Sequence, residues 1–547
     1  MIALINAEDF GKTNAKLPFS IDKMSFIGWM GDLDIENQDE TLKRLAITLK
    51  TLKQELMEPE DRLFFLQKLS ELIEQLSQQL QETYKNSCFP FSEQNHNKLE
   101  LFVSCETEMA KNYAILCEDK DFMFAEVFTQ QQKVLVIYNG IQAQAKVLLY
   151  QSLLYQKPDE GFWSLCYLFY LFAKKNNILD FELESYHSCF ISVFKQILLF
   201  ELSNIRQFNT EELLSIFHVL KILSDQAELL NKVPEKKFKG IPCFNLRVDA
   251  PPSLLKEGAQ QEHPYLIYVS SLNLIKQILD ASANKKILEF CNKSSLLRLI
   301  KTLTMNYQRN SERDATDERL LACVGFEKVK AYVQETEKNK QGKESLAPSG
   351  IRNFKSGMQE IETSRDKSSF FREERAVDLN LSIDLAFLEN IKNSDIWSGE
   401  KELVEQESNK LVINTELVDK SSTGFSLRLN TVATKVGDII GIIISETLVI
   451  TVVRRIIKKQ GNTLQVGVEL LGNNPELLHL GDTRHKNALT ALYLKGDDGV
   501  ESIIIGTSFY QNEDFLFFDN NVRFRVEKQL YMSSTIRHLK VRNGNKI

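Results

Sequence analysis

Three residues in the C-terminal half of the chain have the types and the spacing of a small polar binding motif. Asp419, Ser421 and Gly424 fit the pattern D-x-S-x-x-G in the stretch Val-Asp-Lys-Ser-Ser-Thr-Gly-Phe. A carboxylate can accept paired N–H donors, a serine hydroxyl adds one hydrogen bond, and a glycine lets the backbone turn or approach a ligand closely. Alone, the same stretch could be a polar turn at the end of a strand.

The segments around this motif have the period of β-strands. Phe425–Leu429 and Leu464–Leu470 alternate between apolar and polar side chains, whereas Ile439–Ile444 and Leu448–Val453 are rich in Ile and Val. Such runs, separated by short polar turns, are typical of antiparallel strands. Further strands are predicted at 491–494, 502–505, 515–518 and 522–526. The chain beyond about residue 409 is therefore predicted to be all-β and to form barrels.

This succession of segments resembles the PilZ family. The resemblance rests on four segments in order: the D-x-S-x-x-G strand, the turn at 436–439, the strand ending in Val453-Arg454-Arg455, and the closing strand Val466–Leu471. It implies an antiparallel β-barrel that binds cyclic di-GMP. It also implies that Asp419, Ser421 and Gly424 belong to the ligand site, with the Asp419 carboxylate accepting the N1–H and N2–H donors of a guanine.

PilZ receptors also carry an R-x-x-x-R segment ahead of the first strand, and Arg309 and Arg313 supply it here, before a strand predicted at Glu318–Phe326. Guanidinium groups make bidentate contacts to phosphate oxygens and to the O6/N7 edge of guanine. In a chain with 67 basic residues, such a pair taken alone usually marks a solvated surface. Arg454 and Arg455 are possible further phosphate contacts, although strand alternation is expected to turn only one of them outward.

The distance between the two motifs departs from the pattern of compact PilZ domains, where they lie a few tens of residues apart. Here 106 residues separate Arg313 from Asp419. Residues 335–405 are polar and are predicted to form a mobile insertion between the first and second strands of the barrel. Long surface insertions add little closure entropy, so the split is physically acceptable. The gap also leaves open a PilZ-like scaffold that has lost nucleotide binding.

The N-terminal half has the period of helices. Leucines spaced by three and four predict a helical hairpin over 40–86, and residues 99–304 are predicted to form a helical bundle or solenoid. Asn209 and Glu212 offer capping chemistry for one helix. The apolar run 162–172 is expected in the core. A strand is predicted at Cys243–Val248 and a helix at Pro264–Leu279.

Composition limits the class of protein. The chain has 547 residues, 43% of them hydrophobic, and a formal net charge of −7, which indicates a multidomain globular protein and argues against a general nucleic-acid coat. Neither a secretory signal nor a membrane-spanning segment is recognised, so a cytoplasmic protein is predicted. No zinc, redox or nucleophile pattern is found. We therefore expect no catalytic residue, metal or cofactor, and no enzyme, since turnover of cyclic di-GMP needs clusters of metal-binding carboxylates.

Together these features predict a multidomain α+β protein. An α-helical interaction region, 1–304, is followed by a PilZ-type antiparallel barrel, 305–480, split by the insertion, and by a C-terminal β-module, 485–547. The predicted function is that of a cyclic di-GMP effector that changes conformation and acts through a protein partner on its helical half. The resemblance implies a surface-appendage or motility machine, type IV pili in particular. The alternatives are the degenerate scaffold and a helical-repeat adaptor that acts only through protein contacts.

Overall fold

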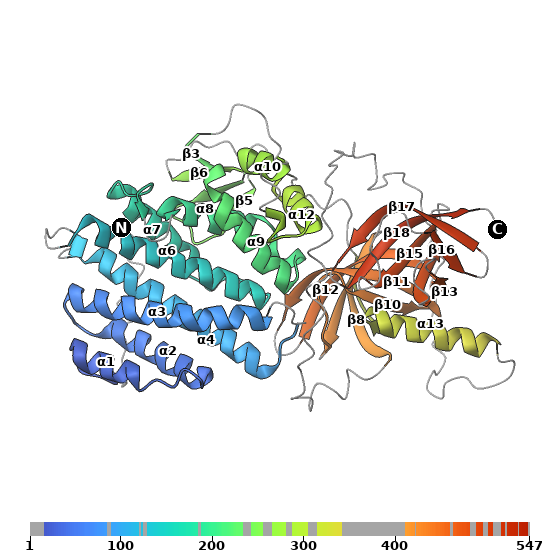
Figure 1. Cartoon of the computed structure of the whole chain (residues 1–547), viewed down its shortest axis with the longest axis horizontal. Coiled ribbons are helices and arrows are strands. Elements are labelled where there is room, and N and C mark those ends of the chain that lie inside the picture. Colours follow the sequence, from blue (N-terminus) through green and yellow to red (C-terminus); the bar gives the residue numbers. More distant parts are fainter. Residues whose placement is uncertain are drawn as a thin grey trace.

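The structure is a computed structural model of the chain, and the account below is confined to the residues that it describes. These are residues 16–84, 89–119, 122–123, 128–183, 188–232, 242–254, 265–280, 287–304, 314–341, 411–421, 423–430, 432–459, 463–481, 488–495, 501–506, 516–519, 522–533 and 535–544. The helical half and the β-half lie at opposite ends of an elongated molecule (Figure 1).

The N-terminal half consists mainly of helices that pack side by side (Figure 1). Its helices are α1 Lys23–Gly31, α2 Gln38–Gln54, α3 Pro59–Tyr84, α4 Glu93–Glu118, α6 Gln130–Leu153, α7 Phe162–Lys175, α8 Phe190–Leu202, α9 Thr210–Leu223, α10 Leu272–Leu279 and α12 Lys293–Thr304, with 3-10 turns η2 Ile205–Gln207 and η3 Ser224–Gln226. Two small sheets accompany them, β1 Glu182–Leu183 with β2 Ser188–Cys189, and, in the order β3-β6-β4-β5, β3 Glu228–Leu230, β6 Leu266–Ser270, β4 Pro242–Asn245 and β5 Ser253–Leu254.

The leucine spacing and the capping residues form the local helical structure that the sequence predicts. The leucine stripes of α2 and α3 are buried, and Pro59 is the first residue of α3, where its missing N–H costs nothing. Asn209 Oδ1 accepts from the Glu212 backbone N–H at 2.9 Å, and Glu212 Oε2 accepts from the Asn209 N–H at 3.0 Å, a complete capping box at α9. The aromatic run of α7 is in the core, with Phe169 fully buried.

The prediction of a helix over Pro264–Leu279 is wrong for the first part of that range. Residues Leu266–Ser270 form strand β6, which pairs with β3 on one side and β4 on the other, and only Leu272–Leu279 is helical. The stretch Leu-Ile-Tyr-Val has high strand propensity, and the two ladders satisfy its backbone hydrogen bonds. Pairing with strands distant in sequence therefore overrides the helical spacing of its apolar residues.

A charged group lies inside the helical half where α3, α4 and α6 meet. Lys146 bonds to Glu74 and lies 3.3 Å from Glu106 Oε1, and Glu106 is 3% exposed. Burial raises the pKa of Glu106, while Lys146 opposes that rise. Tyr150 donates to Ser77 Oγ at 2.9 Å beside this group. Lys146 thus compensates a carboxylate that the fold has removed from water.

The first β-barrel closes in the order β10-β11-β12-β9-β8-β7. Its strands are β7 Asp314–Val324, β8 Ile413–Ser421, β9 Gly424–Asn430, β10 Ile439–Ile444, β11 Thr447–Lys458 and β12 Thr463–Asn473. All neighbours are antiparallel, and β7 pairs with both β8 and β10. The first strand of the barrel is thus joined to strands that lie far beyond it in the sequence. The predicted fold class, a helical half followed by an antiparallel PilZ-type barrel and a further β-module, is confirmed.

Helix α13, Phe326–Gln341, follows β7 directly and covers one side of the barrel. Val329 and Val333 are buried against apolar side chains from both β-barrels, and Glu337 accepts a hydrogen bond from the Leu477 backbone N–H at 3.2 Å. Residues 335–341, which the sequence analysis assigns to the predicted insertion, form the last part of this helix. The rest of the predicted insertion, 342–405, lies outside the described residues.

The C-terminal strands form a second closed barrel, in the order β13-β14-β15-β18-β17-β16. They are β13 Glu476–Gly481, β14 Ala488–Lys495, β15 Glu501–Gly506, β16 Leu516–Asp519, β17 Val522–Met532 and β18 Ile536–Gly544. Counted from its own first strand, each barrel closes in the same order, 1-2-3-6-5-4. Leu492, Ile504 and Ile536 on the outside of the second barrel pack against Ile450 and Val452 of the first. The two barrels therefore share one connectivity and one apolar interface.

The helical half contacts the end of the first barrel. Phe89 and Tyr155 join the barrel's core cluster, and the Phe89 backbone exchanges hydrogen bonds with Thr434 at 2.7 and 3.2 Å. On the same side of the molecule, His96 Nε2 lies 2.6 Å from Lys458 Nζ of β11 and 2.9 Å from Glu100 Oε1 of α4. These contacts link α4 directly to a strand of the barrel.

Within the described ranges, no helix is both long enough and apolar enough to cross a membrane.

Candidate functional site

The D-x-S-x-x-G motif forms the tight hairpin between β8 and β9. Ser421 ends β8, Gly424 begins β9, and the two residues pair directly. Ser421 Oγ donates to the Gly424 carbonyl at 3.1 Å, and the Leu470 N–H donates to the Thr423 carbonyl at 3.0 Å, so the hairpin is fixed to β12 as well. A Cβ on Gly424 would lie 2.1 Å from the Val468 carbonyl oxygen. Only a glycine allows β9 to approach β12 this closely.

A bulge in β8 turns Asp419 to the outer face of the barrel. Leu417 pairs with Leu427 and is buried in the core, so plain alternation would point residue 419 inward as well. The register shifts between Leu417 and Asp419, and Asp419 then pairs with Ser426. Paired residues of antiparallel strands project to the same face, and Ser426 alternates with the core residue Leu427. Asp419 therefore lies outside, as does Ser421.

A second bulge, in β11, turns Arg454 and Arg455 to the outer face of the barrel. Val453 and Ile456 both point into the core, and the register shifts between Val453 and Arg455. Arg454 and Arg455 thus both leave the core, where alternation predicts that only one would. Bulges of this kind commonly re-aim side chains beside functional sites.

These shifts produce one row of residues across neighbouring strands. Arg455 pairs with Gly467, Gly467 with Ser426, Ser426 with Asp419, and Asp419 with Ala315 of β7. Gln465 Nε2, next along the same face of β12, donates to Ser426 Oγ at 2.9 Å. The row therefore brings a cation, an amide and a carboxylate to one face of the barrel, while the Ser426 hydroxyl is fully buried.

Gly467 provides the space that the Arg455 side chain occupies. A Cβ on Gly467 would lie 2.6 Å from Arg455 Nε and 2.7 Å from its Cγ, so the arginine stem runs across the glycine. Arg454 is used differently: its Nε donates to Glu469 at 2.6 Å, and its guanidinium lies 4.1 Å from the ring centre of Tyr531 in the second barrel. Of the two arginines, Arg455 lies in the row with Asp419, and Arg454 joins the two barrels.

Arg309 and Arg313 lie outside the described residues. The described part of β7 begins at Asp314, which pairs with Lys420, and the next residue, Ala315, pairs with Asp419. The strand that follows the arginine pair in the sequence therefore starts beside the D-x-S-x-x-G motif, although β7 ends at Val324 and β8 begins only at Ile413.

Sequence reasoning did not single out Ser426, Gln465 or Gly467 as members of the site. A signal was available, since Leu464, Val466 and Val468 are the core-facing residues of β12 and so place Gln465 and Gly467 on its outer face. The part of the chain that the structure describes holds no group of three or more His, Cys, Asp or Glu side chains that could bind a metal ion. The row can bind an anion through Arg455 and paired N–H donors through Asp419.

Comparison with family models covers most of the chain. Residues 25–235 match the model described as the N-terminal domain of the cyclic-di-GMP receptor FimW, and residues 242–476 match the model described as its middle PilZ domain. The barrel with the Asp419 row thus lies in the region that matches the PilZ model. Searches of curated proteins and of solved structures give no match.

Proposed function

The chain belongs to the FimW family of cyclic di-GMP receptors, and we propose that it binds cyclic di-GMP on the outer face of the first barrel. The observation that carries this proposal is the register row that joins Arg455, Gly467, Ser426 and Asp419 across four strands. Two bulges and two glycines are needed to build that row, which is more than a solvated polar surface requires.

Each group of the row matches a part of the nucleotide. The Asp419 carboxylate accepts the N1–H and N2–H donors of one guanine, and the Ser421 hydroxyl, whose proton goes to Gly424, can accept a further donor. Arg455 binds a phosphate or the O6/N7 edge of a guanine. Gly467 and Gly424 have no side chains to obstruct a flat base. Arg309 and Arg313 complete the charge of the site, since the ligand carries two phosphates.

We further propose that ligand binding changes the position of the barrel relative to the helical half. Lys458 ends the strand that carries Arg455, and it contacts His96 of α4. A shift of β11 on binding would therefore reach α4 through one side-chain contact. The helical half would bind a protein partner in a surface-appendage or motility machine, for which type IV pili are the candidate that the PilZ resemblance implies. In this reading the protein works in the cytoplasm as a receptor without catalysis.

The experiment is isothermal titration of cyclic di-GMP into the full-length protein and into Arg313→Ala, Asp419→Ala and Arg525→Ala. Loss of one hydrogen bond to a charged group costs about 1.5–3 kcal/mol, so each of the first two variants should bind about tenfold to a hundredfold more weakly. Arg525 is exposed on the second barrel, and its variant should bind as the wild type does. Absence of binding by folded wild-type protein would refute the receptor proposal and leave the degenerate scaffold.

A further inference from the structure

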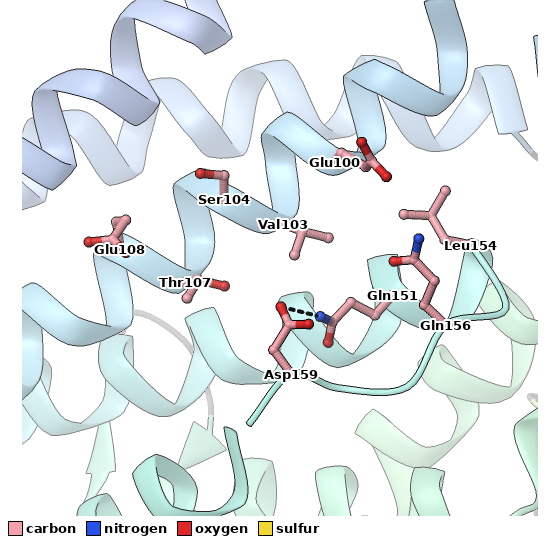
Figure 2. Close-up of a pocket in the computed structure, with 9 residues that line it drawn as sticks. All are labelled: Glu100, Val103, Ser104, Thr107, Glu108, Gln151, Leu154, Gln156 and Asp159. Carbon is pink, nitrogen blue, oxygen red and sulfur yellow. Dashed lines mark hydrogen bonds between the residues drawn. The ribbon is translucent and has the colours of Figure 1, made fainter. Parts of the chain in front are cut away.

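A polar groove crosses the surface of the helical half between α4 and the turn that follows α6 (Figure 2). Its volume is about 370 Å³, which is enough for one or two long side chains. Glu100, Thr107 and Glu108 of α4 line one wall, and Gln151 of α6 with Asp159 of the turn lines the other. None of the nine residues that line it is a lysine, arginine or histidine.

Gln151 is the least expected residue in this groove. It is 2% exposed, its Nε2 donates to Asp159 Oδ2 at 3.2 Å, and its buried Oε1 has no hydrogen-bond partner among the residues that the structure describes. A buried carbonyl oxygen without a donor is destabilising, and native proteins rarely leave one in that state. An unpaired acceptor in a groove wall indicates that the groove receives a donor from outside.

The carboxylates of the groove differ in how far they are already neutralised. Glu108 lies 3.2 Å from Lys53 Nζ and 2.9 Å from Lys111 Nζ, so it has two cations. Asp159 has no ion pair with any side chain in the described ranges, and its polar contact is the Gln151 amide. The free negative charge of the groove is therefore concentrated near Asp159.

Glu100, at the other end of the groove, faces His96 at 2.9 Å. Burial, with the nearby Lys458, lowers the pKa of His96, and Lys458 itself lies close enough to Glu100 for their opposite charges to attract. Glu100 and Asp159 thus give the groove two acidic positions, one on each of its walls (Figure 2).

Two apolar side chains lie among the polar ones that line the groove. Val103 and Leu154 line the groove along with the acidic residues, and the Val103 side chain points into it (Figure 2). Apolar side chains beside acceptor oxygens suit the long hydrocarbon stem and charged end of lysine or arginine. A metal ion does not fit, since no three carboxylate, imidazole or thiol groups among the described residues come together to bind one.

We propose that this groove binds an extended, lysine- or arginine-bearing segment of a partner protein, with basic side chains directed to Asp159 and Glu100. The inference rests on the part of the proposed function that gives the helical half a protein partner, and it does not depend on nucleotide binding. The Glu100–His96 and His96–Lys458 contacts connect the groove to β11.

The test uses a short fluorescein-labelled peptide with two lysines separated by two alanines, titrated into the full-length protein and followed by fluorescence anisotropy. The double variant Glu100→Gln/Asp159→Asn keeps the side-chain shapes but removes both anions, and should weaken binding by about tenfold or more. The matched control is Glu36→Gln/Glu160→Gln, which changes the net charge equally at exposed positions outside the groove. It should bind the peptide as the wild type does.

Two further measurements separate the possible outcomes. Carbodiimide labelling of carboxylates should show Asp159 and Glu100 protected by the peptide, and a peptide with norleucine in place of lysine should neither bind nor protect. Equal binding by the groove variant and the control would overturn the proposal, as would equal binding by the norleucine peptide. The groove variants should bind cyclic di-GMP with the affinity of the wild type. If the wild-type protein binds the peptide but does not bind cyclic di-GMP, the receptor proposal is refuted and the groove proposal stands.

Discussion

Two glycines on neighbouring strands of the first barrel should respond very differently to the same substitution. Gly424→Ala would place a Cβ 2.1 Å from the Val468 carbonyl oxygen, where ordinary contact begins near 3.4 Å. That oxygen is backbone, so β9 and β12 must separate and lose part of their ladder. Overpacking costs about 1–3 kcal/mol, and a backbone clash should lie at the upper limit.

Gly467→Ala meets a side chain instead of a backbone. Its Cβ would lie 2.6 Å from Arg455 Nε, and the flexible arginine can move aside. Replacing a strand glycine by alanine also recovers about 0.5–1 kcal/mol of backbone entropy, so the net change in stability should be near zero. The displaced Arg455 can no longer reach a ligand on the row. If Arg455 contributes one charge-assisted hydrogen bond to the ligand, this substitution should weaken cyclic di-GMP binding by about tenfold to a hundredfold.

The assay combines thermal unfolding with titration of cyclic di-GMP on both variants. A loss of about 3 kcal/mol should lower the Tm of Gly424→Ala by about 6–12 °C for a cooperative unit of 150–250 residues, whereas Gly467→Ala should melt like the wild type. An unchanged Tm for Gly424→Ala would refute the close approach of β9 to β12. Wild-type affinity in Gly467→Ala would refute the role assigned to Arg455.

Other predictions concern buried titratable groups and are tested by denaturant unfolding. Lys146→Met leaves Glu106 buried without its cation and should lower the free energy of unfolding by about 3 kcal/mol. Because burial then raises the pKa of Glu106 further, this loss of stability should be smaller at about pH 5 than at about pH 8. Equal losses at the two pH values would contradict the buried-pair interpretation. His538 is buried beside Ser502 at 2.8 Å, and burial with the nearby Arg454 lowers its pKa to about 4. The unfolded chain binds a proton there near pH 6.5 and the folded chain does not, so this histidine should remove up to about 3 kcal/mol of stability as the pH falls from about 7 to about 4. His538→Gln, which keeps a hydrogen-bonding side chain, should be less sensitive to pH over that window, and an unchanged pH profile would refute the assignment.

The sequence by itself determined much of this protein because its strongest signals are local. Leucine spacing, the Asn209–Glu212 capping box and the position of Pro59 define helices through contacts a few residues apart. The alternation of Leu464, Val466 and Val468 defines β12 in the same way. The D-x-S-x-x-G motif indicated its hairpin, because a serine and a glycine around a tight turn act within a few residues of the chain.

Tertiary structure decided what depends on pairing between distant segments. Alternation predicts that Asp419 and one of the two arginines point inward, and only the bulges in β8 and β11, which exist relative to their partner strands, bring Asp419 and Arg455 to the same outer row. Gly467 matters because Arg455 lies across it, a contact between separate strands. The strand at Leu266–Ser270 likewise forms because β3 and β4 accept it. A register is a property of two segments, so one segment's composition does not fix it.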